Sequence, residues 1–281
     1  MARWALASAL VLVGCMPGLS VLPRLAASTP LSYRAYVGAP AETDRFASAA
    51  VVLMREAADL RAEDLMRRSH ELIAAVPMPA AFPGSLSVRR ETEDRLRVEL
   101  FGDARPTGRE ERGSKGGVTS WEVTPILSAE ISRTGEPVSF FLPRGSHALL
   151  SMVFRMPNDA VSVGDSWQIP AAFLELVGGY RAIDSFCLRR ATLLGVDTRD
   201  DGTRVARILH VAAEGVSGSL HASAEAEPEA FSGRVLYVGY GDFSLTEGAW
   251  IDYRARLWAG GEGAAAFLTR DVLYAFEALP G

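Results

Sequence analysis

The sequence predicts an α+β protein dominated by β-structure, with an antiparallel meander sheet and a helical segment near the N-terminus. Residues from Gly84 onward alternate between apolar and polar with the period of a half-buried strand. Turn-forming residues separate these runs, without the helices of about 10 to 15 residues that a parallel sheet would need between its strands. Before Gly84, strong helix formers dominate. We expect the sheet to be a curved sheet, a sandwich or a half-barrel.

The size and the charge of the chain limit what it can be. Its 281 residues are enough for one large domain or two small ones, and either can bury a core. The net charge is −5, and lysine occurs only once, at Lys115. Nucleic-acid binding needs concentrated lysine and arginine, so we expect no nucleic-acid partner.

The N-terminus has the features of an export signal. Arg3 supplies a positive charge, and Trp4–Gly14 is an apolar run of signal-peptide length. The run ends in Leu12-Val13-Gly14-Cys15, which resembles the bacterial lipobox. That resemblance implies cleavage after Gly14 and a lipid on Cys15, which would attach the protein to a membrane.

Two alternatives to lipidation stay open at this point. Ordinary signal cleavage at Ala26-Ala27-Ser28 would give a secreted or periplasmic soluble protein. A transmembrane helix is the third option, although prolines and a glycine between residues 17 and 23 interrupt the apolar run before it reaches about 20 residues. With a lipobox, the chain divides into a signal peptide (1–14), a tether (15–30) and a β-rich domain (31–281) outside the cytoplasm.

The second cysteine, Cys187, has no partner if Cys15 is acylated or removed, so we expect no disulfide. It lies between Phe186 and Leu188, and a lone cysteine between apolar residues is usually a small buried hydrophobe. The sequence therefore predicts that Cys187 is buried and that the domain is stable without covalent cross-links.

A helical segment is predicted over residues 42–76. From Ala41 to Val76 the chain contains neither glycine nor proline and is rich in strong helix formers. Its apolar residues form two stripes whose phase slips around Arg61–Asp64, which indicates a helical hairpin or a kinked helix. We expect the stripes to pack against the sheet; the alternative is a helix that binds a partner protein.

The rest of the domain is predicted as a series of strands and hairpins. A first short strand with Tyr33, Tyr36 and Val37 is expected within Leu31–Gly38, and two further strands hold Leu86–Val88 and Leu96–Leu100. Gly102–Gly117 is charged and glycine-rich, as expected of a solvated loop. The later elements are a hairpin turning at Thr134-Gly135, a helix within Gly145–Met156, a hairpin turning at Asp200–Gly202, an alternating stretch at Ser219–Glu225, a hairpin turning at Thr246–Gly248, and a strand or helix within Ala264–Leu279.

Gly164-Asp165-Ser166-Trp167 resembles a catalytic motif. It is similar to the Gly-Asp-Ser sequence of a large class of esterases, in which an Asp-x-x-His element supplies the base. No histidine of this chain has an aspartate three residues before it; the four are His70, His147, His210 and His221. A serine without an oriented base is a poor nucleophile. We therefore interpret the stretch as a turn that opens a strand, with Trp167 and Ile169 on one face, and assign no catalytic residue.

Motifs for metals and cofactors are missing from the sequence. It contains no His-Glu-x-x-His, no cysteine pair at zinc spacing, no calcium or phosphate loop and no Gly-x-Gly-x-x-Gly between a strand and a helix. His210 and His221 lie on different expected strands without a third ligand. We therefore expect neither a metal nor a cofactor.

Aromatic residues concentrate in the β-rich part of the chain. They include Trp121, Trp167, Tyr237, Tyr240, Trp250, Tyr253 and Trp258. On strands such residues usually pack in a core or shield an edge. The alternative is a curved sheet that they line, which would hold an apolar ligand in the manner of a lipid-carrier half-barrel.

The order of these features resembles a family of uncharacterised bacterial extracytoplasmic proteins, often lipoproteins, known as a domain of unknown function. The shared features are the apolar signal, the hairpin at Thr134-Gly135, the strand opener Val163–Trp167, and the hairpins at Asp200–Gly202 and Thr246–Gly248. The resemblance covers about Val118–Leu279. It implies an extracytoplasmic location and a β-rich architecture, but no substrate.

The sequence therefore predicts a bacterial envelope lipoprotein that binds a partner protein or an apolar ligand on its antiparallel sheet and is not an enzyme. The alternative is a secreted hydrolase whose catalytic residues the sequence does not identify. A hydrolase would need a serine, a cysteine or a carboxylate pair in a concave pocket, with a base in reach.

Overall fold

The structure is a computed structural model that describes residues 20–26, 30–40, 45–101, 125–141, 146–174, 179–221 and 227–279. The predictions for Cys15, for the loop Gly102–Gly117 and for Trp121 lie outside these residues.

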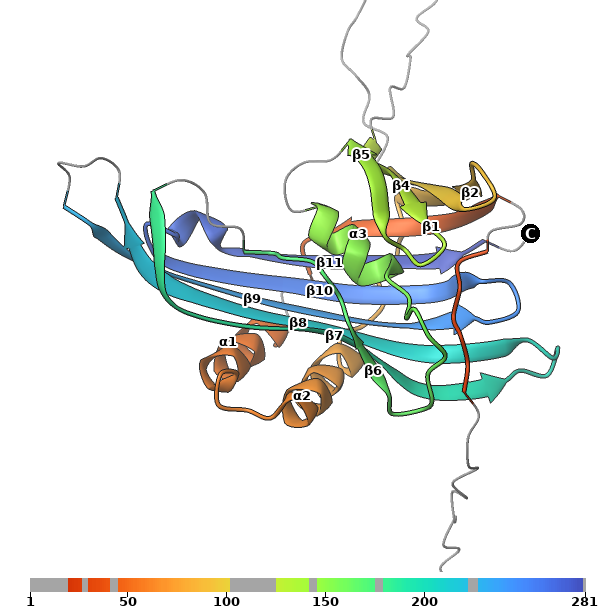
Figure 1. Cartoon of the computed structure of the whole chain (residues 1–281), viewed down its shortest axis with the longest axis horizontal. Helices are drawn as coiled ribbons and strands as arrows, with labels where there is room; N and C mark the ends of the chain where they lie inside the picture. The colour runs from red at the N-terminus through yellow and green to blue at the C-terminus, as the bar shows by residue number, and fades with distance from the viewer. Residues whose placement is uncertain are drawn as a thin grey trace, which may run out of the picture.

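Within the described ranges, eleven strands form a single antiparallel sheet (Figure 1). The strand order is β5-β4-β3-β2-β1-β11-β10-β9-β8-β7-β6, so β1 joins a meander of β2–β5 to a meander of β6–β11. The bounds are β1 (Leu31–Gly38), β2 (Gly84–Arg90), β3 (Arg95–Phe101), β4 (Pro125–Ser132), β5 (Pro137–Phe141), β6 (Ser166–Gln168), β7 (Tyr180–Thr198), β8 (Arg204–Leu220), β9 (Glu229–Ser244), β10 (Ala249–Gly263) and β11 (Arg270–Ala278). The predicted β-dominated α+β class is confirmed. The sheet is open, with β5 and β6 at its edges.

The predicted hairpins at Asp200–Gly202 and Thr246–Gly248 join β7 to β8 and β9 to β10. The glycine that ends each turn has a positive φ, 81° and 67°, which glycine adopts without strain. The Thr203 N–H donates to the Asp201 carboxylate at 2.8 Å, which holds the first turn. The first residues of β7, Arg181–Ser185, are exposed throughout, so the sequence shows no apolar alternation that would predict a strand there.

Two predicted segments differ from the structure in detail. Ser219 and Leu220 end β8 and do not begin a strand of their own, and residues 222–226 lie outside the description. The segment Ala264–Leu279, predicted as either strand or helix, contains one turn of 3-10 helix (Ala266–Leu268) followed by β11.

The prediction that Cys187 is buried is wrong, because its side chain is exposed on β7. β6 pairs only with Arg190–Thr192 of β7, so the earlier half of β7 extends beyond its neighbour. The neighbouring Phe186 and Leu188 pack against the helix-covered face of the sheet. Since successive strand residues point to opposite faces, Cys187 lies on the other face from these neighbours, and their burial does not predict its own.

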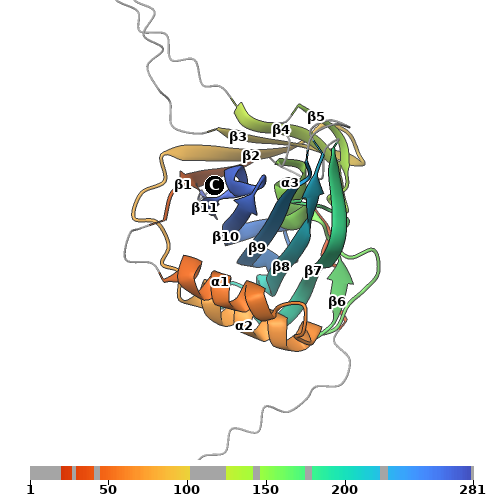
Figure 2. The ribbon, with the colours of Figure 1, turned by 90° about the vertical axis from the view of Figure 1, so that its left-hand side faces the viewer.

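Helices α1 (Phe46–Glu56) and α2 (Ala62–Ala74) cover one face of the sheet (Figure 2). They confirm the predicted helical hairpin, and their break falls at Ala57–Arg61. Their stripes pack on the sheet as expected; the buried contacts involve Phe46, Ala50, Leu53, Met54, Leu65, Met66 and Ile73 with Leu209, Val211, Leu236 and Val238. None of the helices in the described ranges is long and apolar enough to cross a membrane.

The opposite face of the sheet holds the larger core. Helix α3 (Ser146–Phe154) begins and ends within its predicted range and lies between the β2–β5 half and the long strands (Figure 2). Buried residues of both halves belong to one apolar cluster with α3, among them Leu86, Val98, Val235 and Tyr253. The sheet thus bends around α3, which places the first candidate site between the helix and the strands.

Candidate functional site

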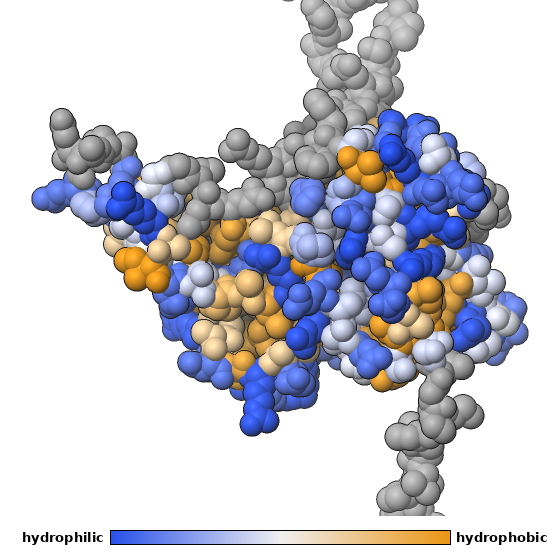
Figure 3. All heavy atoms as spheres, viewed as in Figure 1, coloured by the Kyte–Doolittle hydropathy of each residue, from blue (hydrophilic) through white to orange (hydrophobic). Residues whose placement is uncertain are grey.

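The outer surface in Figure 3 does not single out one region as a binding site. On the face seen in Figure 3, apolar patches over the helices and the long strands are interleaved with charged side chains. Among the described residues, Ile183 and Phe267 are the most exposed large apolar side chains, at 83% and 74%. Scattered apolar exposure of this kind is normal on soluble proteins. The cavities offer more specific chemistry.

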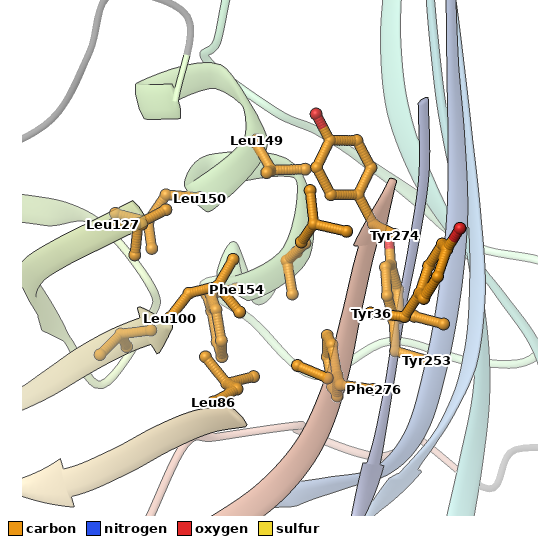
Figure 4. A pocket seen from close by; sticks show the side chains of 15 residues that line it. Tyr36, Leu86, Leu100, Leu127, Leu149, Leu150, Phe154, Tyr253, Tyr274 and Phe276 are labelled. Atoms are coloured by element: carbon orange, nitrogen blue, oxygen red, sulfur yellow. The ribbon is translucent and has the colours of Figure 1, made fainter. Parts of the chain in front are cut away.

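An apolar cavity of about 40 Å³ lies between α3 and the bend of the sheet (Figure 4). Its lining comes from β1–β4, α3, β10 and β11. Figure 4 shows leucines of the β2–β4 half facing Leu150 and Phe154 of α3, with Phe276 and Tyr253 on the opposite wall. No lining side chain is ionised at neutral pH, because the only titratable ones are tyrosines. The site is built to exclude water and charge.

The strand register explains one wall of the cavity. Leu86 on β2 is opposite Leu100 on β3, and Leu100 is opposite Leu127 on β4, so three leucines form a row across three strands. Apolar and polar residues alternate along each of these strands, which puts the leucines on the inner face together. This alternation predicts that Leu86 and Leu100 lie on strands. It does not predict that they are opposite each other, because that depends on how β2 and β3 align.

Two indole N–H groups hold the end of α3 against the sheet. Trp250 Nε1 donates to the Val153 carbonyl at 3.2 Å, and Trp167 Nε1 donates to the Arg155 carbonyl at 3.0 Å. Helix ends leave carbonyls without helical partners, so these bonds satisfy groups that would otherwise be buried unpaired. Trp167 therefore anchors α3 just after the turn that the sequence indicated.

A buried polar cluster adjoins the cavity behind Tyr253. The Tyr253 hydroxyl lies 2.9 Å from the Tyr237 hydroxyl and 3.3 Å from His210 Nδ1. Burial lowers the pKa of His210 to about 3 and raises the pKa of Tyr253, so both are neutral at physiological pH. A side chain at Gly239 would collide with the Tyr253 hydroxyl, which explains a glycine inside β9.

The remaining predicted aromatics lie on two faces. Trp250, Tyr253 and Tyr237 are in the core that surrounds α3, whereas Tyr240 and Trp258 pack under the helices α1 and α2. The aromatic side chains therefore serve both core packing and the lining of a cavity, and sequence alone does not separate these two roles.

Ser166 is the first residue of β6, as predicted for a strand opener. Its hydroxyl forms a 2.7 Å hydrogen bond with the Thr192 hydroxyl, and no histidine in the described ranges bonds to it. The Asp165 carboxylate accepts the Ser162 N–H at 2.8 Å, and Gly164 has a φ of 93°, so the two residues before Ser166 form a turn. Ile169 is buried and Trp167 is half-buried in the same core.

The histidines do not come together. His70 packs against Tyr240 in a tilted ring contact, with centroids 5.3 Å apart, on the helix-covered face. His210 is buried on the other face, and His221 Nε2 lies 2.9 Å from the Ser219 hydroxyl near the end of β8. In the described part of the chain, no group of three or more histidine, cysteine, aspartate or glutamate side chains is placed to hold a metal ion.

No protein-family model matches the chain, and no curated protein is similar to it. The fold and the cavity define only a general class, an open antiparallel sheet that bends around an apolar cavity under a short helix. The resemblance to bacterial extracytoplasmic proteins of unknown function therefore stays a prediction.

Proposed function

We propose that the protein binds an apolar ligand between α3 and the bent sheet, as a lipid-anchored protein of the bacterial cell envelope. The observation that carries the proposal is the cavity, whose lining is apolar on every wall. The apolar run Trp4–Gly14 and the lipobox-like Leu12–Cys15 support the location. We propose no catalytic role for Ser166, because it bonds to Thr192 and to no base among the described residues.

The energetics favour an apolar group in the cavity over water. Most of the lining consists of leucine, valine, alanine and phenylalanine side chains, which offer a water molecule no hydrogen-bond partner, so the cavity favours an apolar group. An empty cavity of about 40 Å³ costs about 1 kcal/mol in lost packing, at about 24 cal/mol per Å³. Each methylene group that enters gains about 0.8 kcal/mol.

The present volume limits what can enter without rearrangement. About 40 Å³ accommodates the end of an acyl chain but not the whole of one. A longer chain enters only if α3 moves away from the sheet, and the two indole bonds at Val153 and Arg155 make the end of α3 the natural hinge. We therefore propose α3 as the element whose displacement admits the ligand.

Co-purified lipid is the direct test of ligand binding. We expect native mass spectrometry of the chain extracted from bacterial membranes to show about one non-covalent lipid per protein. Leu127→Phe fills the cavity from β4 and should reduce this occupancy about tenfold or more, because one lost apolar contact of about 1.4 kcal/mol already gives that factor. Val138→Phe, at an exposed position of the neighbouring β5, is the matched control and should keep the lipid.

Two results would contradict the proposed binding: no bound lipid in the wild type, or equal occupancy in Leu127→Phe. Recovery of a stoichiometric protein in place of lipid would favour the predicted alternative, a partner-binding role. The anchor is tested separately by the intact mass of the same protein. We expect a diacylglyceryl adduct on Cys15 that Cys15→Ser abolishes, whereas a mature chain that begins near Ser28 would contradict the anchor.

A further inference from the structure

A second hollow, a cleft of about 550 Å³, lies on the helix-covered face of the sheet. Side chains of β1 and β8–β11 form its floor, and the segment Met78–Phe82 that follows α2 forms a wall. Its lining mixes charged groups of both signs with Phe82, Tyr240 and Met78. It lies on the opposite face from the apolar cavity, so nothing in the proposed function uses it.

The register of the sheet places five charged residues in one row across the floor of the cleft. Along the row each residue is directly opposite the next: Arg207, Asp242, Asp252, Glu277 and Arg34. Neighbouring strands are only about 4.8 Å apart, and like charges directly opposite each other destabilise a sheet. The central carboxylate, Asp252, therefore has a carboxylate on each side.

Arginines compensate the outer two carboxylates but not the central one. Arg34 Nε donates to the Glu277 carboxylate at 3.1 Å. Arg199 Nη2 and Arg207 Nε each lie 3.4 Å from a carboxylate oxygen of Asp242. Among the described residues, no cationic side chain lies within 4.0 Å of Asp252, which accepts one long bond of 3.4 Å from the Asp242 N–H. Desolvation and the neighbouring Asp242 carboxylate raise the pKa of Asp252. Among the described residues, Asp252 thus has no direct ion-pair partner, although the more distant Arg199 partly offsets the rise in its pKa.

Arg254, in contrast, is a cation without an acidic partner among the described residues. It lies two residues beyond Asp252 on the same face of β10, about 7 Å along the strand. Its Nη1 donates to the Val76 carbonyl at 2.8 Å, and its guanidinium carbon lies 5.8 Å from the centroid of the Tyr240 ring. In the described ranges, no acidic side chain lies within 4.0 Å of it. The bond to Val76, just after α2, holds the guanidinium in place, with four N–H groups left for another acceptor.

We propose that the cleft binds a small amino-acid-like zwitterion whose ammonium group pairs with Asp252 and whose carboxylate pairs with Arg254. An ammonium group at Asp252 relieves the repulsion in the charged row, and a carboxylate at Arg254 forms charge-assisted bonds with the free N–H groups. Phe82, Tyr240 and Met78 supply apolar surface for the body of the ligand. The volume of about 550 Å³ is in the range of small-molecule sites.

Three probes that share one body separate these contacts. L-phenylalanine carries both charges, phenethylamine only the ammonium and 3-phenylpropionate only the carboxylate. In isothermal titration of the full chain at low salt and pH 7, we expect L-phenylalanine to bind about tenfold more tightly than either single-charge probe, because each lacks one charge-assisted contact. Asp252→Asn should reduce the affinity for L-phenylalanine to the 3-phenylpropionate level, and Arg254→Gln to the phenethylamine level.

The controls keep the site and the fold distinguishable. Glu229→Gln removes an exposed carboxylate at the start of β9 and should leave all three affinities unchanged. Asp252→Asn removes a repulsion, so it should fold at least as well as the wild type. Leu127→Phe should also leave L-phenylalanine binding unchanged, since that residue lines the cavity on the other face. Equal affinity for the three probes, no binding of L-phenylalanine at millimolar concentration, or insensitivity to Asp252→Asn would each overturn the proposal.

Discussion

Lowering the pH from 7 to 4 should destabilise the folded protein by about 3 kcal/mol through His210 alone. The side chain is fully buried, and burial lowers its pKa to about 3, whereas the pKa of histidine in an unfolded chain is about 6.5. Between these values the unfolded chain binds a proton that the folded state does not, so stability is lost as the pH falls through this window. Integrating that linkage from pH 7 to pH 4 gives about 3 kcal/mol.

The surroundings of His210 account for the size of the effect. Its Nδ1 lies 3.3 Å from the Tyr253 hydroxyl, and Nε2 has no hydrogen-bond partner among the described residues. Trp250 lies edge-on to the ring, with centroids 5.8 Å apart. Among the described residues, no carboxylate bonds to this ring, so a proton on His210 would place an uncompensated charge in the core.

Urea unfolding followed by tryptophan fluorescence at pH 7 and pH 4 measures the effect. The carboxylates of the protein titrate in wild type and variants alike, so the informative quantity is the difference between them. We expect the loss of unfolding free energy on acidification to be about 3 kcal/mol smaller in His210→Leu than in the wild type. Tyr253→Phe keeps the histidine and should keep the full loss. An equal loss in His210→Leu and the wild type would refute the reasoning.

Three further variants test other parts of the structure. Glu214 is 2% exposed and accepts hydrogen bonds from the backbone N–H groups of Phe173 and Leu174 and from the Arg189 guanidinium. Glu214→Ala should therefore lower the unfolding free energy in urea titration by about 3 kcal/mol, and a loss below about 1 kcal/mol would contradict a stabilising role. Asp252 has a raised pKa, so its charged form opposes folding: Asp252→Asn should be more stable than the wild type at pH 7, and this advantage should shrink as the pH falls through the raised pKa. Trp250→Phe removes the bond to Val153 and should speed hydrogen exchange of α3 amides, while unchanged exchange would mean that the indole does not hold the helix.

The local elements were largely predictable because their signals are local. The apolar stripes between Phe46 and Val76 have helical periodicity, and the phase slip near Arg61 marks the break between α1 and α2. Gly202 and Gly248 sit where the turns require a positive φ. In each case, residues close in sequence determine the structure.

The cavity was not predictable because it depends on long-range register. Ala35 on β1 is opposite Phe276 on β11, so the first strand of the domain pairs with the last. Leu86 and Leu127 meet only because β2, β3 and β4 have one alignment out of several that the alternation permits. A slip of one residue would turn every side chain of a strand to the other face. The exposure of Cys187 was not predicted for a related reason. β6 is too short to cover this part of β7, and nothing in the sequence around Cys187 indicates how far β6 extends.

A β-bulge in β10 connects the two candidate sites. The register shifts between Trp250 and Asp252, so Ile251 is an extra residue in that strand. Trp250 and Tyr253 therefore both face the core around α3, although strict alternation would place residues three apart on opposite faces. The same shift turns Asp252 and Arg254 toward the cleft. Without the extra residue, Trp250 and Asp252 could not both keep their faces. Either the Trp250 indole that holds α3 would leave the core, or the Asp252 carboxylate would enter the core at a large desolvation cost. The bulge is thus what allows a single strand to line an apolar cavity on one face and a charged cleft on the other.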